Sequence, residues 1–269
     1  MRLVVDHVTT YRYDRPVRGV VQSHRLTPAQ FDGQRVLRWD VAVSDAVAGG
    51  GFRDGAGDWV QGWTVAGPVS EITVTVRGEV ETLDMAGVLR GHREAVAPFA
   101  YLRFTTATRC DIALSALARA VGDDGGPLAL AHGLAQAVAE AIAYRPGATG
   151  AHTTAAEALS IGEGVCQDHA HALIALARDR GLPARYVSGY LHTDAAGTPH
   201  EAAHAWAEVH VEGLGWVGFD PANRCCPDDR YIRLGSGLDA RDAAPIRGTA
   251  RGGAAEMLDV TVAVLSAQQ

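Results

Sequence analysis

Cys166 stands where a glycine-containing turn meets a segment with the hydrophobic periodicity of a helix. A helix begins with free N–H groups and a partial positive charge, and both favour the thiolate form of a cysteine. The thiolate is a nucleophile, and the same N–H groups can hold a negatively charged oxygen. A buried, unreactive cysteine explains the position equally well. Cys166 is therefore a candidate nucleophile that needs a base beside it.

His204 opens the segment HAWAEVHV, in which every second residue is small or apolar, as in a strand. Asp220 follows in the segment WVGFDP, at an even separation (220 − 204 = 16), and a glycine-containing turn lies between them. If the hairpin turns near Glu212, His204 and Asp220 lie opposite each other on one face. A carboxylate there orients an imidazole and stabilises its cation. With Cys166 this predicts acyl transfer through a thioester, and a purely structural His–Asp pair is the alternative.

The segment HEAAH, which ends at His204, offers a different chemistry because it matches the HExxH pattern of zinc proteases. His200, His204 and His210 would be the zinc ligands, and Glu201 would be the base. However, histidines four residues apart chelate one ion only from a helix, and the surrounding pattern predicts a turn and then a strand. The longer motif also needs a glycine where Ala207 stands. We therefore expect no metal here, with His200 and His210 at the surface or rim.

The elements that must position these residues change in character along the chain. Residues 1–85 read as short strands separated by turns, which predicts a β-sandwich-like domain or, alternatively, the first sheet of a larger α+β domain. Residues 109–144 have helical periodicity, whereas the pattern is again β after Pro183, with a last strand over 258–265. We expect an N-terminal β domain over 1–85 and an α+β catalytic domain over 95–269.

Two blocks of this sequence resemble the bacterial transglutaminase-like superfamily: GEGVCQDHAHALIALARDRGLPARYVSGYL and HAWAEVHVEGLGWVGFDPANR. YRYDRPV resembles the β domain that precedes this core in bacterial members, and DAAPIRG resembles the segment after it. The resemblance covers nearly the whole chain and implies a papain-like fold with a Cys-His-Asp triad. By this likeness Cys166 is the nucleophile, His204 the base and then the acid, and Asp220 the orienting carboxylate. His169 departs from the family, in which an aromatic residue is common at that position.

Bacterial relatives of this architecture are commonly regarded as peptidases, so the resemblance implies a cysteine peptidase or amidase that hydrolyses a peptide or protein amide. Transamidation with an external amine shares every step up to the thioester and stays an alternative, as do a non-catalytic binding or scaffold module and the zinc protease. Gln167 and Asp168 are expected to bond first-turn backbone groups and brace the Cys166 loop. His169 is expected to pack or to border the pocket, and Trp206 to line a substrate groove or to pack in the core.

The composition excludes several other chemistries. All 24 basic residues are arginine, so the chain has no lysine for a Walker-type phosphate loop, a pyridoxal-phosphate site or a Schiff base. We expect no cofactor. A net charge of −7 argues against a nucleic-acid partner, and no apolar run reaches the roughly 20 residues of a membrane span. The N-terminus has no signal-peptide core, and the four cysteines form no CxxC pair, so we expect a reduced, cytoplasmic protein.

Overall fold

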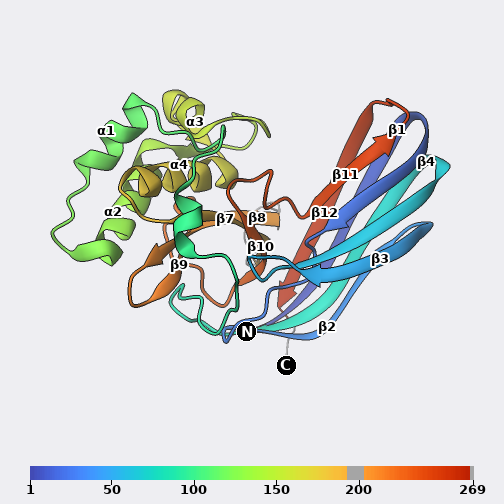
Figure 1. The fold of residues 1–269 in the computed structure, drawn as a ribbon, viewed down its shortest axis with the longest axis horizontal. Coiled ribbons are helices and arrows are strands. Elements are labelled where there is room, and N and C mark those ends of the chain that lie inside the picture. The colour runs from blue at the N-terminus through green and yellow to red at the C-terminus, as the bar shows by residue number, and fades with distance from the viewer. Residues whose placement is uncertain (193–202, 267–269) are drawn as a thin grey trace.

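The computed structural model describes residues 1–192 and 203–266 and shows two parts side by side (Figure 1). One part is a long antiparallel sheet, and the other is a mixed body of helices around a smaller sheet. This confirms the α+β class predicted from the sequence. The HExxH residues His200 and Glu201 lie outside the described residues. Within the described ranges, no helix is long and apolar enough to cross a membrane.

Six strands form the long sheet. They are β1 (Arg2–His24), β2 (Gln34–Val43), β3 (Ala46–Arg53), β4 (Trp59–Thr82), β11 (Ile246–Arg251) and β12 (Glu256–Ser266). The long strands β1 and β4 pair in the centre, and each carries two shorter strands along its outer edge: β11 and β12 on β1, and β2 and β3 on β4. Buried residues alternate with exposed ones along most of β1, as expected for a sheet with one covered face.

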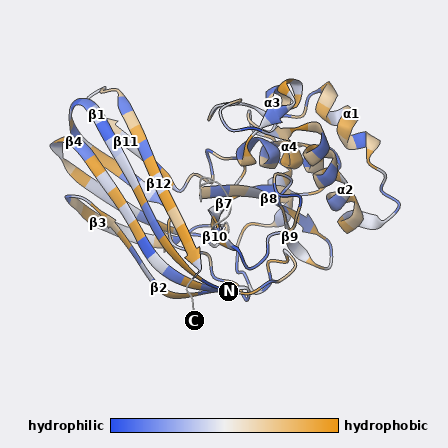
Figure 2. Ribbon diagram, turned by 180° about the vertical axis from the view of Figure 1, so that it is seen from behind, coloured by the Kyte–Doolittle hydropathy of each residue, from blue (hydrophilic) through white to orange (hydrophobic). Residues whose placement is uncertain are grey.

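The N-terminal strands form one hydrogen-bonded sheet rather than the two sheets of the expected sandwich. Register shifts between Arg12 and Val17, and again before Gly19, interrupt the pairing of β1 with β4, yet side chains from both halves share one core. The sheet also includes β11 and β12, which the sequence-based division placed in the catalytic domain of residues 95–269. β12 is hydrophobic along much of its length (Figure 2), so its pattern predicted a strand but could not name its partner.

The mixed body contains the remaining elements. They are the 3-10 helix η1 (Pro98–Leu102), the helices α1 (Ile112–Ala120), α2 (Gly126–Ala141), α3 (Ala155–Ile161) and α4 (Cys166–Asp179), and the strands β5 (Ala143–Tyr144), β6 (Glu163–Gly164), β7 (Ala184–Leu191), β8 (Ala203–Val211), β9 (Gly215–Phe219) and β10 (Tyr231–Gly237). The strands β10-β7-β8-β9 form an antiparallel sheet in that order, and β5 and β6 form a short parallel pair.

Helix α4 is the central element of the mixed body. Ala170, Leu173 and Ile174 are buried, as their helical spacing predicts, and they join one hydrophobic core with α1, α2, α3 and the sheet. The helix ends at Asp179, and Gly181, two residues beyond it, has a φ of 75° in the left-handed region that glycine adopts without strain. A helix packed on all sides holds its first residue in a fixed place, and that residue is Cys166.

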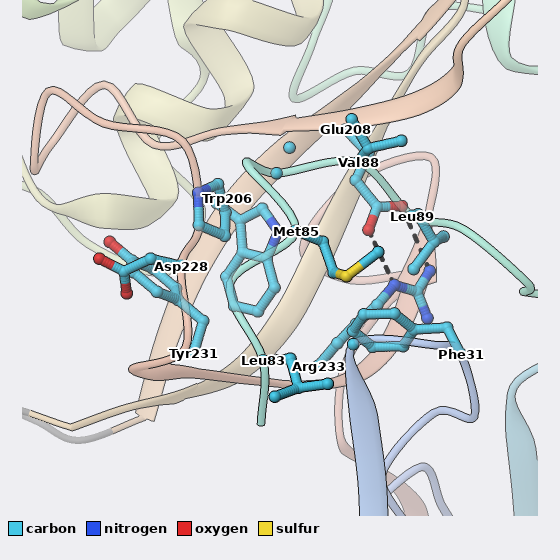
Figure 3. A pocket seen from close by; sticks show the side chains of 14 residues that line it. Phe31, Leu83, Met85, Val88, Leu89, Trp206, Glu208, Asp228, Tyr231 and Arg233 are labelled. Carbon is cyan, nitrogen blue, oxygen red and sulfur yellow. Dashed lines mark hydrogen bonds and ion pairs between the residues drawn. The ribbon is translucent and has the colours of Figure 1, made fainter. Parts of the chain in front are cut away.

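A buried network of charges joins the mixed body to the long sheet. Glu208 of β8 accepts hydrogen bonds from Arg185 of β7 (Nε to Oε2, 2.7 Å) and from Arg233 of β10 (Nε to Oε1, 2.8 Å). Arg233 also donates to Asp58, the residue just before β4 (NH1 to Oδ1, 2.8 Å), and Arg185 donates to Glu94 (2.5 Å). The side chains of Arg185, Glu208, Arg233 and Asp58 are at most 4% exposed. Figure 3 shows Glu208 and Arg233 beside a cavity of about 40 Å³.

Candidate active site

Cys166 is the first residue of α4, as predicted, and the turn before it is braced by Asp168. The carboxylate Oδ2 of Asp168 accepts hydrogen bonds from the backbone N–H of Val165 (2.8 Å) and from the hydroxyl of Thr149 (2.5 Å). A Cβ at Gly164 would lie only 2.7 Å from the Cβ of Asp168, so the turn requires glycine there. The bracing role predicted for Asp168 is therefore present in the structure.

Gln167 and His169 support neighbouring segments. The side-chain amide of Gln167 donates to the carbonyl oxygen of Ala151 over 3.4 Å, rather than bonding a first-turn backbone group as predicted. His169 is 2% exposed, and its Nδ1 and Nε2 each lie 2.9 Å from a carbonyl oxygen, that of Val165 and that of Ile142 at the end of α2. His169 thus connects the end of α2 to the start of α4. Of the two expectations for this residue, packing and bordering the pocket, the structure shows packing.

The strands β8 and β9 bring His204 and Asp220 together. The pairing of Val211 with Gly215 shows that the hairpin turns at Gly213, one residue later than expected. Continuing this register puts Trp206, not His204, opposite Asp220, and His204 lies one pleat further along the same face. The two side chains still meet, with His204 Nε2 2.6 Å from Asp220 Oδ2.

Cys166 also acts on His204, because its side chain is among the groups that raise the pKa of this imidazole. Nε2 faces Asp220, which leaves Nδ1 as the ring nitrogen that can serve the sulfur. One imidazole thus connects the cysteine at the start of α4 to a carboxylate that is 1% exposed. Of the three residues selected from the sequence, His204 and Asp220 are in direct contact, and Cys166 influences the same imidazole.

The electrostatics of this constellation favour a charged imidazole. Burial lowers the pKa of His204, but hydrogen bonds to Asp220 and Cys166 and the charges of both outweigh it, and the pKa is raised to about 10. Burial raises the pKa of Asp220, but the hydrogen bond and charge of His204, with donors from Asn223 and Tyr231, lower it below its usual value. His204 is therefore held as a cation beside an ionised Asp220 at neutral pH.

This raised pKa predicts how the imidazole titrates. In an NMR titration, the ring of His204 should stay protonated through neutral pH and lose its proton only near pH 10. Its contribution to folding stability is fully present below the ordinary pKa of about 6.5 and is lost as the pH rises toward 10. The Asp220→Asn variant should titrate at lower pH, because the carboxylate no longer stabilises the cation. A midpoint near 6.5 in the unmodified protein would contradict the prediction.

Trp206 packs behind the imidazole. It is 3% exposed, its ring stacks on that of His204 at a centroid distance of 6.4 Å, and Tyr231 meets its face edge-on at 5.5 Å. Trp206 therefore packs in the core, which was one of the two expectations for it, rather than lining an open groove.

Sequence reasoning missed Tyr231 and Asn223, which both bond Asp220. Asn223 follows in the Asp-Pro-Ala-Asn segment, a local signal, whereas Tyr231 comes from another strand and offers none.

The zinc alternative does not fit the described part of the site. His204 and His210 lie on strand β8, where six residues extend over about 20 Å, too far for one ion. The ring of His210 packs edge-on against Trp216 at 5.3 Å, at the other end of the strand from His204. In residues 1–192 and 203–266, no group of three or more histidine, cysteine or acidic side chains could hold a metal ion.

Comparisons with known proteins find relatives of this chain and a solved structure with its fold. The chain is 31% identical to "Uncharacterized protein ML0607" of Mycobacterium leprae over 98% of both chains. It is 32% identical to the protein-glutamine gamma-glutamyltransferase of Pseudomonas aeruginosa, over 45% of this chain and 20% of the relative. A crystal structure from Cytophaga hutchinsonii, described as a candidate cysteine protease, has the same fold, with a TM-score of 0.75 at 20% identity over 100% of this chain and 92% of that one.

Two family models match separate parts of the chain. Residues 3–81 match the bacterial transglutaminase-like N-terminal region, which corresponds to most of the long sheet. Residues 114–221 match the transglutaminase-like superfamily, and this range includes Cys166, His204 and Asp220. Together with the relative that matches over its full length, these results show that the chain belongs to the transglutaminase-like superfamily.

Proposed function

We propose that this protein hydrolyses amide bonds of peptide or protein substrates through a thioester at Cys166. The observation that carries the proposal is the imidazole of His204, which lies 2.6 Å from the buried carboxylate of Asp220 and whose pKa is raised by both Asp220 and Cys166, the first residue of α4. This arrangement supplies a nucleophile, a proton carrier and an orienting carboxylate. It also argues against a scaffold module, which needs none of the three.

The reaction follows from the positions of these groups. The Cys166 thiolate attacks the amide carbonyl carbon, and the oxygen takes the negative charge. Cys166 is the first residue of α4, so its N–H precedes the hydrogen-bonded turns of the helix and can stabilise that oxygen. The C–N bond then breaks as protonated His204 gives its proton to the leaving amine, which leaves a thioester. His204, now neutral, takes a proton from water, and hydroxide attack releases the carboxylic acid and the thiolate.

Transamidation is the second candidate, supported by the match to the Pseudomonas aeruginosa glutamyltransferase. An amine would attack the same thioester in place of water. This chain has no lysine, so its own side chains offer no amine for that step. The amine would have to come from another molecule.

The two candidates differ in what resolves the thioester. Purified protein should be incubated with a peptide library in water enriched in ¹⁸O, with and without an added primary amine. Hydrolysis predicts a new carboxylate that carries ¹⁸O and forms without the amine, and the product should be absent with Cys166→Ala. A product that forms only with the amine, as a new amide, would replace hydrolysis by transamidation.

A further inference from the structure

The carboxylate of Asp220 is held by more than the catalytic histidine. Its Oδ2 lies 2.6 Å from His204 Nε2 and accepts further hydrogen bonds from the side-chain amide of Asn223 (2.7 Å) and the hydroxyl of Tyr231 (2.8 Å). Its Oδ1 accepts from the backbone N–H of Asn223 at 3.2 Å. A carboxylate bonded only to an imidazole could rotate, whereas these donors leave one orientation.

The two additional donors come from different parts of the fold. Asn223 belongs to the turn that follows Asp220, so its hold on the carboxylate is local. Tyr231 is the first residue of β10, is 5% exposed, and packs edge-on against Trp206 at 5.5 Å and near His204 at 5.9 Å. The packed ring places the hydroxyl independently of the turn, so Asp220 is held from two sides.

These donors also determine whether the proton between His204 and Asp220 stays on the imidazole or moves to the carboxylate. Donors to a carboxylate stabilise its ionised form. Because Asn223 and Tyr231 bond the same oxygen that faces His204, they weaken the tendency of Asp220 to take the proton from the imidazole. The proton then remains on His204, where the departure of an amine requires it.

We infer that Tyr231 and Asn223 are positioning residues that clamp Asp220 in its orientation and keep it ionised, so that His204 holds its proton beside Cys166. Neither residue needs to touch the substrate. The consequence for turnover rests on the proposed function, whereas the consequence for the reactivity of Cys166 does not.

The test is the pH dependence of alkylation at Cys166 in Tyr231→Phe, measured with iodoacetamide and quantified on the Cys166 peptide by mass spectrometry. Losing one hydrogen bond to a charged group corresponds to about a 10- to 100-fold change. We expect the acid limb of the alkylation rate to move to higher pH, because Asp220 is protonated more easily. With an amide substrate, kcat should fall by a similar factor while KM is retained.

Tyr190→Phe is the matched control. Tyr190 is a buried tyrosine of β7 whose hydroxyl lies 2.7 Å from Nδ1 of His7 in β1, so the variant removes the same atom from a hydrogen bond that does not involve Asp220. It should leave the pH dependence of alkylation at Cys166 in place, even if the melting temperature falls. A shift equal to that of Tyr231→Phe would overturn the inference.

A double-mutant cycle distinguishes positioning from general stability. In an Asp220→Asn background, Tyr231→Phe should cause no further loss of alkylation or turnover, because the hydroxyl acts through the carboxylate. Equal losses in both backgrounds would refute the clamp. If Tyr231→Phe does not fold, Asn223→Ala removes the exposed donor and should shift the acid limb in the same direction. If the variants shift alkylation at Cys166 as expected but the protein cleaves no amide, only the proposed function is refuted.

Discussion

Replacing Cys166 with alanine is expected to abolish amide hydrolysis, with a fall in rate of at least about 10⁴-fold. The variant keeps the start of α4, the bracing by Asp168 and the His204–Asp220 pair, because none of these contacts uses the sulfur. What it lacks is the atom that forms the thioester, and water attacking directly has no comparable route. The measurement is the rate of product formation by the purified variant, with its fold confirmed by circular dichroism.

Cys110→Ala is the control for a general effect of removing a thiol. Cys110 lies just before α1, is free and partly buried, and hydrogen-bonds only weakly to the carbonyl oxygen of Asp111 at 3.7 Å. Burial, with the nearby carboxylate of Asp179, raises its pKa to about 12, so little thiolate forms there. Activity should survive this change. Full activity in Cys166→Ala would remove Cys166 from the mechanism, whatever the control shows.

Glu208→Gln should cause the largest loss of stability among single substitutions in the charge network. Burial raises the pKa of Glu208, but the charges and hydrogen bonds of Arg233 and Arg185 outweigh it and lower the pKa to about 2, so the carboxylate is ionised at neutral pH. Its replacement leaves two buried guanidinium groups without their shared counter-charge. Breaking a buried ion pair in this way costs about 3–5 kcal/mol. The midpoint of urea unfolding at pH 7 measures the effect.

Glu71→Gln is the matched control, because it removes the same charge from an exposed pair. Glu71 accepts from Arg12 at 2.9 Å on the surface of the long sheet, and both side chains are at least half exposed. Such a pair contributes at most about 1 kcal/mol. Similar unfolding midpoints for Glu208→Gln and Glu71→Gln would show that the buried network adds little to stability.

The parts of the site that depend on local pattern could be predicted from the sequence. The helix that starts at Cys166 and the strand that begins near His204 follow from the spacing of apolar residues, and so does the strand before Asp220. The expected centre of the hairpin was one residue too early, which shifts the pairing by two residues, because the glycine-containing turn allows more than one centre. His204 and Asp220 still meet, since both lie on one face of the sheet.

The parts that depend on distant pairing could not be predicted. Tyr231 reaches Asp220 only because β10 pairs with β7, two strands away from β9 in the sheet. Glu208 lies on the same face of β8 as His204, but its partners come from β7 and from β10, and Arg233 of β10 connects it to Asp58 just before β4. The alternation of residues along a strand indicates which face of the sheet a residue occupies, but it does not indicate which distant residues pack against that face.

The pairing of β1 with β12 has a consequence for how the chain folds. Leu3 lies opposite Ser266, and Tyr13 lies opposite Glu256, so the first strand meets this partner only after almost the whole chain has been synthesised. Contacts of such high sequence separation form slowly, because a long loop must close first. The helices around α4 and the hairpin of β8 and β9 have much more local contacts and can form earlier. During synthesis, the edge of β1 that β11 and β12 later cover is left open and exposed to pairing with other chains.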